Sequence, residues 1–393
     1  MQIADSIQKI KSSATIAVAA KVRELKSKQE PVIGLNAGEP DFDTPLSIKQ
    51  AAIDAIHDND TRYTAVEGTL ALREKIVEKF NRDNNLTFDT QQIIVSTGAK
   101  QAIYQGIAAI LNPGDEVLVP SPYWTSYPDM IALAGGQCIP ILTTPQDGFK
   151  LTPEQLRKHI TQRTKLIILN SPNNPTGAVY NKEELAALGQ VLVEFPHVAI
   201  ITDDIYEYLI WDQPFYNLLN ACPELADRTL VVNGVSKAYA MTGWRIGYAA
   251  GPKDWIAAMK KIQSQTTSGT NSIAQAAATE ALSGGFSSVQ HMTQEMKKRH
   301  DVLYKALNEI DGITTLPSHG TFYLFIDVSG LIEQLDLKDD IDFCHYMLDE
   351  CKIAMVPGQA FGRANCVRVS FATSMSKCEE ALSRIKQMIA TKA

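Results

Sequence analysis

Five short runs of apolar, largely β-branched residues recur through the middle of the chain and constrain its fold more than any other feature. They occupy residues 92–95, 116–119, 166–169, 198–201 and 230–232. Runs that are short and apolar throughout suit strands buried on both faces of a largely parallel sheet. Helical patterns lie between them, at residues 101–111 and 182–194 for example, so the middle of the chain is predicted to be α/β.

The two ends of the chain follow a different pattern. A helical pattern at residues 294–308 precedes two apolar runs, 321–326 and 366–371, as in a separate α+β unit. With 393 residues, the chain is long enough for two or three domains of roughly 150 residues each. We predict a large domain over residues 46–284, and a smaller domain in which an N-terminal segment, 1–45, joins residues 285–393.

Composition excludes several classes of function. The net charge of −7, with no basic block, makes nucleic acid and anionic membranes poor partners. Six scattered cysteines without a C-x-x-C pair argue against a zinc site or a disulfide framework and fit a reducing cytoplasm. No run approaches the roughly 20 apolar residues of a membrane span, and residues 14–20 are too short for a signal peptide. The absence of G-x-G-x-x-G and G-x-x-x-x-G-K-[ST] counts against a dehydrogenase or a kinase.

Polar side chains follow three of the apolar runs at the point where each run ends. Residues 170–177 (NSPNNPTG) follow the third run, Asp203 and Tyr206 follow the fourth, and Lys237 follows the fifth. Ligands gather at the carboxyl ends of parallel strands, so an amide, a carboxylate with a phenol, and an amine are expected at one edge. Taken singly, the NSPNNPTG segment is also a plain turn and Asp203 a helix cap. Their matching positions favour a binding site.

Lys237 belongs to the segment 236–248 (SKAYAMTGWRIGY). A lysine delivered by a buried strand into a turn of small residues can be desolvated, which lowers its pKa and frees an amine for Schiff-base chemistry. The alternative is an ordinary solvated lysine at a strand end. Arg245, eight residues later, can return to the same pocket as a counter-charge for a phosphate. Residues 96–101 (STGAKQ) leave a strand and open a helix, whose backbone N–H groups suit a phosphate as well.

With these motifs in place, the chain resembles the class I pyridoxal-phosphate-dependent aminotransferases, and most closely the bacterial aspartate aminotransferases. The resemblance implies the fold of that family, a mostly parallel seven-stranded sheet in a large domain plus a smaller α+β domain. It extends over nearly the whole chain through residues 35–45, Tyr63, 98–101, 121–124, 173–177, 203–206, 236–248 and Arg368.

The resemblance also implies how the cofactor ring is held. Lys237 would be the Schiff-base lysine and proton shuttle, and Asp203 the partner of the pyridine nitrogen. A carboxylate there keeps the nitrogen protonated and strengthens the ring as an electron sink. Asn174 and Tyr206 would contact the ring oxygen, and Trp124 would stack on the ring.

The phosphate contacts implied by the resemblance come from two subunits. Arg245 and the backbone of Ala99 and Lys100 would hold the phosphate, and Tyr63 would reach the phosphate of the neighbouring subunit. Many family members carry a serine three residues before the lysine. Here that position is glycine, and Ser236 stands next to the lysine instead, so its contact with the phosphate is an open alternative.

For the substrate, the resemblance implies that Gly38 and Arg368 hold the α-carboxylate, beside Trp124 and Asn174. A surface arginine on an edge strand is the competing interpretation of Arg368. The distal carboxylate of aspartate would lie near Lys100 together with Ser13 and Thr15, although the last two could simply cap or line a helix start.

These expectations describe a cytoplasmic homodimer with shared active sites, and no role for a metal ion. The predicted reaction is the reversible, pyridoxal-phosphate-dependent transfer of an amino group from L-aspartate to 2-oxoglutarate, which gives oxaloacetate and L-glutamate. Three alternatives stay open. They are an aminotransferase for aromatic amino acids or prephenate, a β-lyase acting on cysteine conjugates, and a regulator that binds the cofactor without catalysis.

Overall fold

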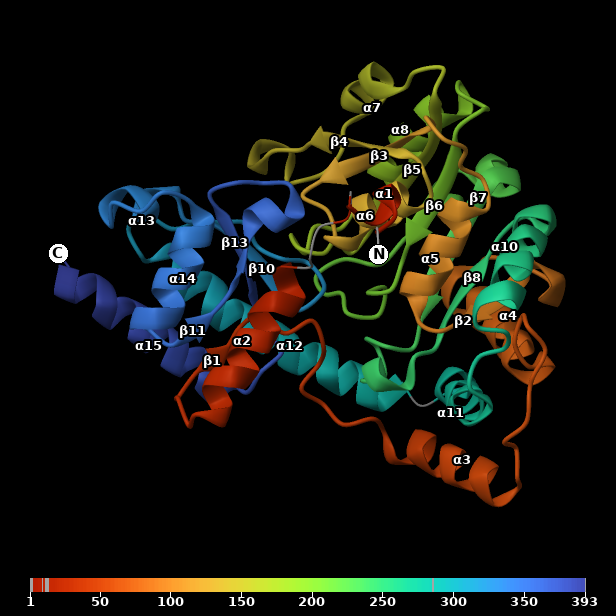
Figure 1. The fold of residues 1–393 in the computed structure, drawn as a ribbon, viewed down its shortest axis with the longest axis horizontal. Helices are drawn as coiled ribbons and strands as arrows, with labels where there is room; N and C mark the ends of the chain where they lie inside the picture. The colour runs from red at the N-terminus through yellow and green to blue at the C-terminus, as the bar shows by residue number, and fades with distance from the viewer. Residues whose placement is uncertain (1–2, 9, 11–13, 285, 393) are drawn as a thin grey trace.

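The computed structural model describes residues 3–8, 10, 14–284 and 286–392. Figure 1 shows two parts: a larger one built on the main sheet, and a smaller one that contains the C-terminal helix α15 (Met375–Lys392). The long helix α12 (Phe286–Asn308) runs from the larger part into the smaller one.

The larger part contains a seven-stranded sheet in the order β2-β8-β7-β6-β5-β3-β4. Its members are β2 (Ile93–Ser96), β8 (Gly247–Ala250), β7 (Thr229–Gly234), β6 (Ala199–Asp203), β5 (Thr164–Asn170), β3 (Glu116–Ser121) and β4 (Gln137–Leu142). Strands β4, β3, β5, β6 and β7 pair in parallel, and β8 is antiparallel to both of its neighbours. The predicted α/β class and mostly parallel sheet are confirmed.

Each of the five predicted runs forms a strand of this sheet because successive residues face two different cores. Ile167 packs into one core, for example, and Leu166 and Ile168 into the other. Two strands were not predicted. The edge strand β4 contains a proline and has three exposed residues among its six, and β8 consists of small residues and one tyrosine. Neither segment shows the apolar run by which buried strands are recognised.

Helices cover both faces of the sheet. Side chains of α5 (Ala99–Ala108), α6 (Ser126–Leu133) and α10 (Lys253–Thr266) fill one core. Those of α4 (Leu70–Asn84), α8 (Lys182–Val193) and α11 (Ser272–Ser283) fill the other. The remaining helices of this part are α3 (Leu46–His57), which packs on α11, together with α7 (Pro153–His159) and α9 (Leu218–Ala221). The helix predicted at 101–111 is α5, which begins two residues earlier and ends three earlier.

The smaller part has its own core, in which Ile33 and Leu35 pack with side chains from residues 292–388. Its antiparallel sheet has the order β12-β13-β10-β9, and a second, parallel pair joins β1 to β11. The strands are β12 (Val356–Pro357), β13 (Cys366–Ser370), β10 (Tyr323–Asp327), β9 (Thr314–Thr315), β1 (Ile33–Gly34) and β11 (Ile353–Ala354). The other helices of this part are α2 (Ala14–Ser27), α13 (Ser329–Gln334) and α14 (Asp340–Glu350), whereas the short helix α1 (Asp5–Gln8) lies beside α6 of the larger part (Figure 1).

Short 3-10 turns connect several elements. They lie at Thr90–Gln92, Pro145–Asp147, Pro223–Arg228, Thr242–Trp244 and Gly358–Phe361. In the part of the chain that the structure describes, no helix combines the length and apolarity needed to cross a membrane.

Candidate active site

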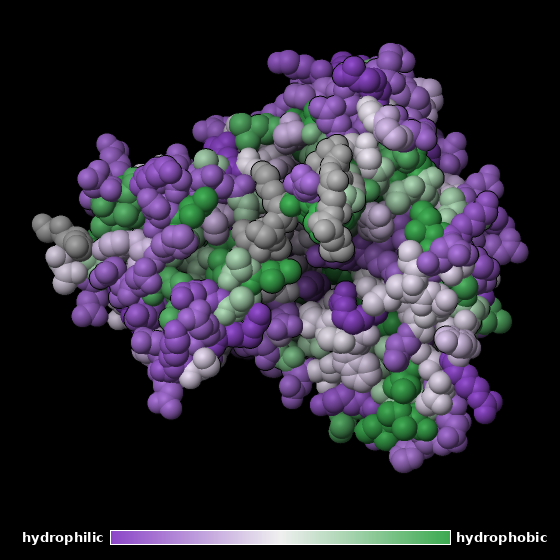
Figure 2. Space-filling model, viewed as in Figure 1, coloured by the Kyte–Doolittle hydropathy of each residue, from purple (hydrophilic) through white to green (hydrophobic). Residues whose placement is uncertain are grey.

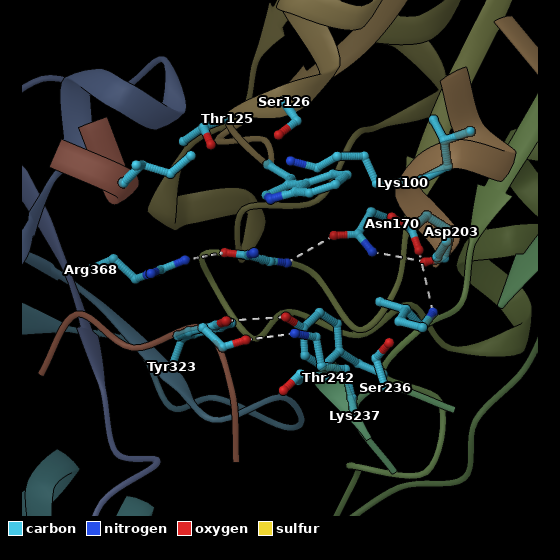
Figure 3. Close-up of a pocket in the computed structure, with 18 of the residues that line it drawn as sticks. Lys100, Thr125, Ser126, Asn170, Asp203, Ser236, Lys237, Thr242, Tyr323 and Arg368 are labelled. Atoms are coloured by element: carbon cyan, nitrogen blue, oxygen red, sulfur yellow. Dashed lines mark hydrogen bonds between the residues drawn. The ribbon is translucent and has the colours of Figure 1, made fainter. Parts of the chain in front are cut away.

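A cavity of about 240 Å³ lies at the carboxyl edge of the main sheet, where the smaller part meets it (Figure 3). Strands β5, β6 and β7 pair in parallel, and β2 runs in the same direction because β8 is antiparallel to both β2 and β7, so all four strands end at this edge. The cavity is lined by eleven of the residues predicted for the site: Gly38, Ala99, Lys100, Trp124, Asn174, Asp203, Tyr206, Ser236, Lys237, Arg245 and Arg368.

Lys237 lies in the turn that follows β7, and its side chain enters the cavity. The Nζ atom donates a hydrogen bond to the carbonyl oxygen of Gly38 at 2.5 Å. Burial lowers the pKa of Lys237 to about 8, because desolvation penalises the charged amine. The residue is therefore not an ordinary solvated lysine, and a substantial fraction of its amine is neutral and nucleophilic near pH 8.

The residues around this turn explain the departure from the family pattern. A Cβ atom on Gly234 would lie 3.0 Å from the Cα of Gly247 and 3.0 Å from the carbonyl oxygen of Ile246. These are backbone atoms at the start of β8 and just before it, so the position has little room for a serine. Ser236 lies on the cavity wall next to Lys237.

Asp203 is the last residue of β6 and is only 4% exposed. Its Oδ2 atom accepts a hydrogen bond from the hydroxyl of Tyr127 at 2.6 Å, and its Oδ1 atom accepts a long one from the N–H of Ile205 at 3.4 Å. Burial raises the pKa of Asp203 to about 6, and the bond from Tyr127 opposes that shift. Asp203 is therefore a buried anion at neutral pH, not a helix cap.

Arg368 reaches the cavity from β13 and is 2% exposed, which rules out the surface arginine. Its Nη1 donates to Asn174 Oδ1 at 3.0 Å, and its Nη2 donates to the carbonyl oxygen of Asn36 at 3.0 Å. The guanidinium lies 4.2 Å from the ring centroid of Tyr323. Its buried Nε has no hydrogen-bond partner among the described residues, as expected of a group that awaits an anionic ligand.

A chain of amides links Arg368 to Asp203 (Figure 3). Beyond the bond from Arg368 to Asn174, the N–H of Asn174 donates to Asn170 Oδ1 at 2.9 Å, and Asn170 Nδ2 donates to the carbonyl oxygen of Asp203 at 2.8 Å. The first residue of the NSPNNPTG segment thus joins the turn to β6. This segment is part of the site and not only a connecting turn.

Aromatic side chains complete the walls of the cavity. The hydroxyl of Tyr206 lies 3.1 Å from that of Tyr323. Lys100 Nζ lies 4.9 Å from the ring centroid of Trp124, and burial together with the charge of Arg245 lowers the pKa of Lys100. The cavity therefore has an excess of positive charge at this end.

The start of α5 forms a cradle with Arg245. Gly98 is the N-cap, with φ at 81° and no side-chain cap on the helix. A Cβ atom at Gly98 would lie 2.1 Å from Arg245 Nη2, so the guanidinium occupies the space that only glycine leaves open. Arg245 Nη1 also donates to the carbonyl oxygen of Thr242 at 2.8 Å. Uncapped N–H groups beside a guanidinium form a site for a phosphate.

Three predicted residues are not among the described residues that line the cavity. Tyr63 is fully exposed and lines a separate surface groove with neighbours such as Arg62 and Thr270. Ser13 lies outside the described residues. Thr15 lies in α2, but its side chain is outside the described part of the structure.

Sequence reasoning missed four residues that shape the site: Tyr127, Asn170, Tyr323 and Asn36. Asn170 lies within the NSPNNPTG segment, and Tyr127 follows Trp124 by three residues, so both stand beside quoted motifs. Tyr323 lies in an apolar run, where an aromatic residue indicates core packing. Asn36 contributes a backbone carbonyl, for which the residue type gives no signal.

Comparison with known proteins identifies the family. Residues 30–385 match the family model "Aminotransferase class I and II". The chain belongs to this family, whose members use pyridoxal phosphate, and it is an aminotransferase.

Relatives that match over their full length support the same family assignment. An aspartate/prephenate aminotransferase of Nitrosomonas europaea is 50% identical, and the match covers 99% of this chain and 100% of that protein. A crystal structure of the aspartate aminotransferase from Rhizobium meliloti is similar with a TM-score of 0.94 at 45% identity, over 98% of both chains. The aspartate aminotransferase from Thermus thermophilus with maleate gives a TM-score of 0.93 at 41% identity, over 98% of this chain and 99% of that one.

Proposed function

We propose that this chain is a pyridoxal-phosphate-dependent aspartate aminotransferase, which transfers the amino group of L-aspartate to 2-oxoglutarate and yields oxaloacetate and L-glutamate. One observation carries the proposal: a single cavity contains a lysine of lowered pKa, a buried carboxylate and a buried arginine, namely Lys237, Asp203 and Arg368. The names of the full-length relatives support aspartate as the amino donor.

The residues present fit the cofactor. Arg245 and the backbone N–H groups of Ala99 and Lys100 would hold the phosphate in the cradle that Gly98 leaves open. Asp203 would face the ring nitrogen. Asn174 and Tyr206 would contact the ring oxygen, Trp124 would stack on the ring, and Ser236 is a candidate for a further phosphate contact. When bound, pyridoxal phosphate supplies an electron sink for negative charge at the α-carbon of the amino acid.

The chain contributes binding, orientation and proton transfer. Arg368, with Gly38 and Asn174 beside it, would hold the α-carboxylate through its planar fork of donors. Lys237 would bind the cofactor aldehyde, and as a free amine it would move the proton at the substrate α-carbon. Asp203 would hold its negative charge next to the ring nitrogen, so that the nitrogen remains protonated. Lys100, with Ser13 and Thr15, would receive the distal carboxylate.

We further propose a cytoplasmic homodimer with shared active sites. Tyr63 is fully exposed and absent from the cavity of its own chain, as expected if it serves the partner's site. A cluster of exposed apolar side chains, seen in Figure 2 over α3, includes Leu46, Ile53 and Ile56 and supports an interface on this face. The six free thiols fit a reducing compartment.

The small domain is proposed to combine residues 1–45 with residues 285–393 around the large domain, 46–284.

A coupled transamination assay tests the proposal. Purified protein loaded with pyridoxal phosphate should convert L-aspartate and 2-oxoglutarate to oxaloacetate, detected with malate dehydrogenase and NADH. Prephenate as acceptor is the second candidate, because the relative from Nitrosomonas europaea is named for both reactions. A preference for aromatic donors would change the substrate assignment only. Pyruvate and ammonia formed from cysteine conjugates without an added oxo acid would indicate a β-lyase. The third alternative, a regulator without catalysis, does not fit a chain that is an aminotransferase.

A further inference from the structure

Tyr127 contacts the carboxylate of Asp203 from outside the cavity. Its hydroxyl donates to Asp203 Oδ2 at 2.6 Å, a distance typical of an O–H donor on a charged acceptor. Tyr127 is 1% exposed, and it does not line the cavity into which Asp203 faces. The hydroxyl of Tyr127 therefore reaches the site only through Asp203.

Among the described residues, the hydroxyl of Tyr127 is the only side-chain donor to the carboxylate of Asp203. The other carboxylate oxygen receives the long backbone bond from Ile205 at 3.4 Å. The titratable groups that face Asp203 are Tyr127 of α6, Lys237 of the turn after β7, and Asp204 and Tyr206 of its own segment. Because burial already raises the pKa of Asp203 to about 6, the loss of one strong donor would bring its protonation into the neutral range.

The surrounding structure fixes the orientation of Tyr127. Its ring meets the ring of Trp124 edge to face, with centroids 5.3 Å apart, and its N–H donates to the carbonyl oxygen of Trp124 at 3.1 Å. Burial and the charge of Asp203 raise the pKa of Tyr127 well above its usual value, so its hydroxyl remains a donor. One short segment thus presents Trp124 to the cavity and places Tyr127 behind Asp203.

We propose that Tyr127 is a positioning residue whose hydroxyl keeps Asp203 ionised and directed at the ring nitrogen of bound pyridoxal phosphate. This role rests on the proposed function. It adds to the site a residue that touches neither substrate nor cofactor.

The test compares Tyr127→Phe with Tyr180→Phe. Tyr180 is also buried, at 4% exposure, and its hydroxyl accepts a hydrogen bond from the N–H of Leu151 at 2.7 Å, away from the cavity. Both variants lose one buried hydroxyl, and thermal unfolding checks that both are folded. The affinity for pyridoxal phosphate is measured by equilibrium dialysis from pH 5 to pH 8.

In the wild type, affinity should weaken as the pH falls through about 6, where Asp203 loses its charge. Tyr127→Phe should move this midpoint upward by about one pH unit, which weakens binding about twofold at pH 7 and about tenfold at pH 5. Tyr180→Phe should leave the midpoint unchanged. In an Asp203→Asn background the midpoint should disappear, and Tyr127→Phe should have no further effect on affinity.

The outcomes separate this proposal from the one on which it rests. Failure of the wild type to retain pyridoxal phosphate would overturn the proposed function and this role together. If the wild type binds pyridoxal phosphate but the midpoint of Tyr127→Phe equals that of Tyr180→Phe, the positioning role alone is overturned. The role is also wrong if Tyr127→Phe weakens binding equally with and without Asp203.

Discussion

The amine of Lys237 donates a hydrogen bond to the carbonyl oxygen of Gly38 across 199 positions of sequence. Two contacts anchor the N-terminal segment that carries Gly38. Thr44 Oγ1 donates to the carbonyl oxygen of Ala240 at 2.7 Å, and Trp244 Nε1 donates to Thr44 Oγ1 at 3.1 Å. The N-terminal segment around Gly38 and Thr44 and the turn after β7 therefore hold each other at the cavity.

The lowered pKa of Lys237 predicts how the rate of cofactor capture depends on pH. Only the neutral amine attacks an aldehyde, so the rate at which apoprotein captures pyridoxal phosphate should rise with pH and level off above a midpoint of about 8. Stopped-flow absorbance measures the rate. A rate that still increases tenfold per unit at pH 10 would show that the amine has an ordinary lysine pKa.

The substitution Arg368→Lys tests recognition of the α-carboxylate. Lysine retains the charge but loses the planar fork, so kcat/KM for L-aspartate should fall by about 1.5–3 kcal/mol of transition-state stabilisation. Arg384→Lys is the matched control, because Arg384, like Arg368, donates to two carbonyl oxygens, here the backbone ones of Pro31 and Cys351, but lies outside the cavity. Equal kinetics for Arg368→Lys and the wild type would make Arg368 a structural residue.

Much of this site could be predicted from the sequence because parallel strands place their carboxyl ends at one edge. Once the apolar runs were identified as strands, Asp203, Asn174 and Lys237 had to lie close together. The family resemblance added Arg368 and Gly38, which come from distant segments that no local pattern joins to the sheet. These two assignments depend on packing between the two parts of the molecule.

Other features could not be predicted, for physical reasons. Strand β8 forms because backbone hydrogen bonds join it to β2 and β7, not because of an apolar run. Tyr127 follows a cavity residue by three positions, yet its importance comes from a single contact with β6, 76 residues away. Periodicity reports burial, and it does not report which buried hydroxyl meets which carboxylate.

Lys100→Ala tests the selection of the distal carboxylate. Removal of this cation should reduce kcat/KM for L-aspartate roughly tenfold more than for L-phenylalanine, which has no distal charge to pair. Lys253→Ala serves as the control, since Lys253 is about half exposed and pairs with Asp89 on the surface. Equal losses for the two substrates would assign Lys100 to the cofactor phosphate alone.

Subunit exchange tests the shared site. Consider a hybrid dimer of a Lys237→Ala chain and a Tyr63→Ala chain. If Tyr63 serves the partner's cofactor, one active site of this dimer contains both substitutions and the other contains neither. Random reassortment of equal amounts should restore about a quarter of wild-type sites, because half the dimers are hybrids with one intact site of two. Both parents must first be shown to be dimeric, folded and strongly impaired. Recovery no greater than the parental average, despite proven exchange, would remove Tyr63 from the partner's site.

The most direct test of the account is the identity of the lysine that binds the cofactor. Protein loaded with pyridoxal phosphate is reduced with borohydride, digested, and mapped by mass spectrometry. Among the described residues, two lysines, Lys237 and Lys100, line the cavity, and only Lys237 follows β7 opposite the buried Asp203. The account predicts the pyridoxyl phosphate adduct on Lys237 and its loss in Lys237→Ala. An adduct on Lys100, or on any lysine outside the cavity, would contradict it.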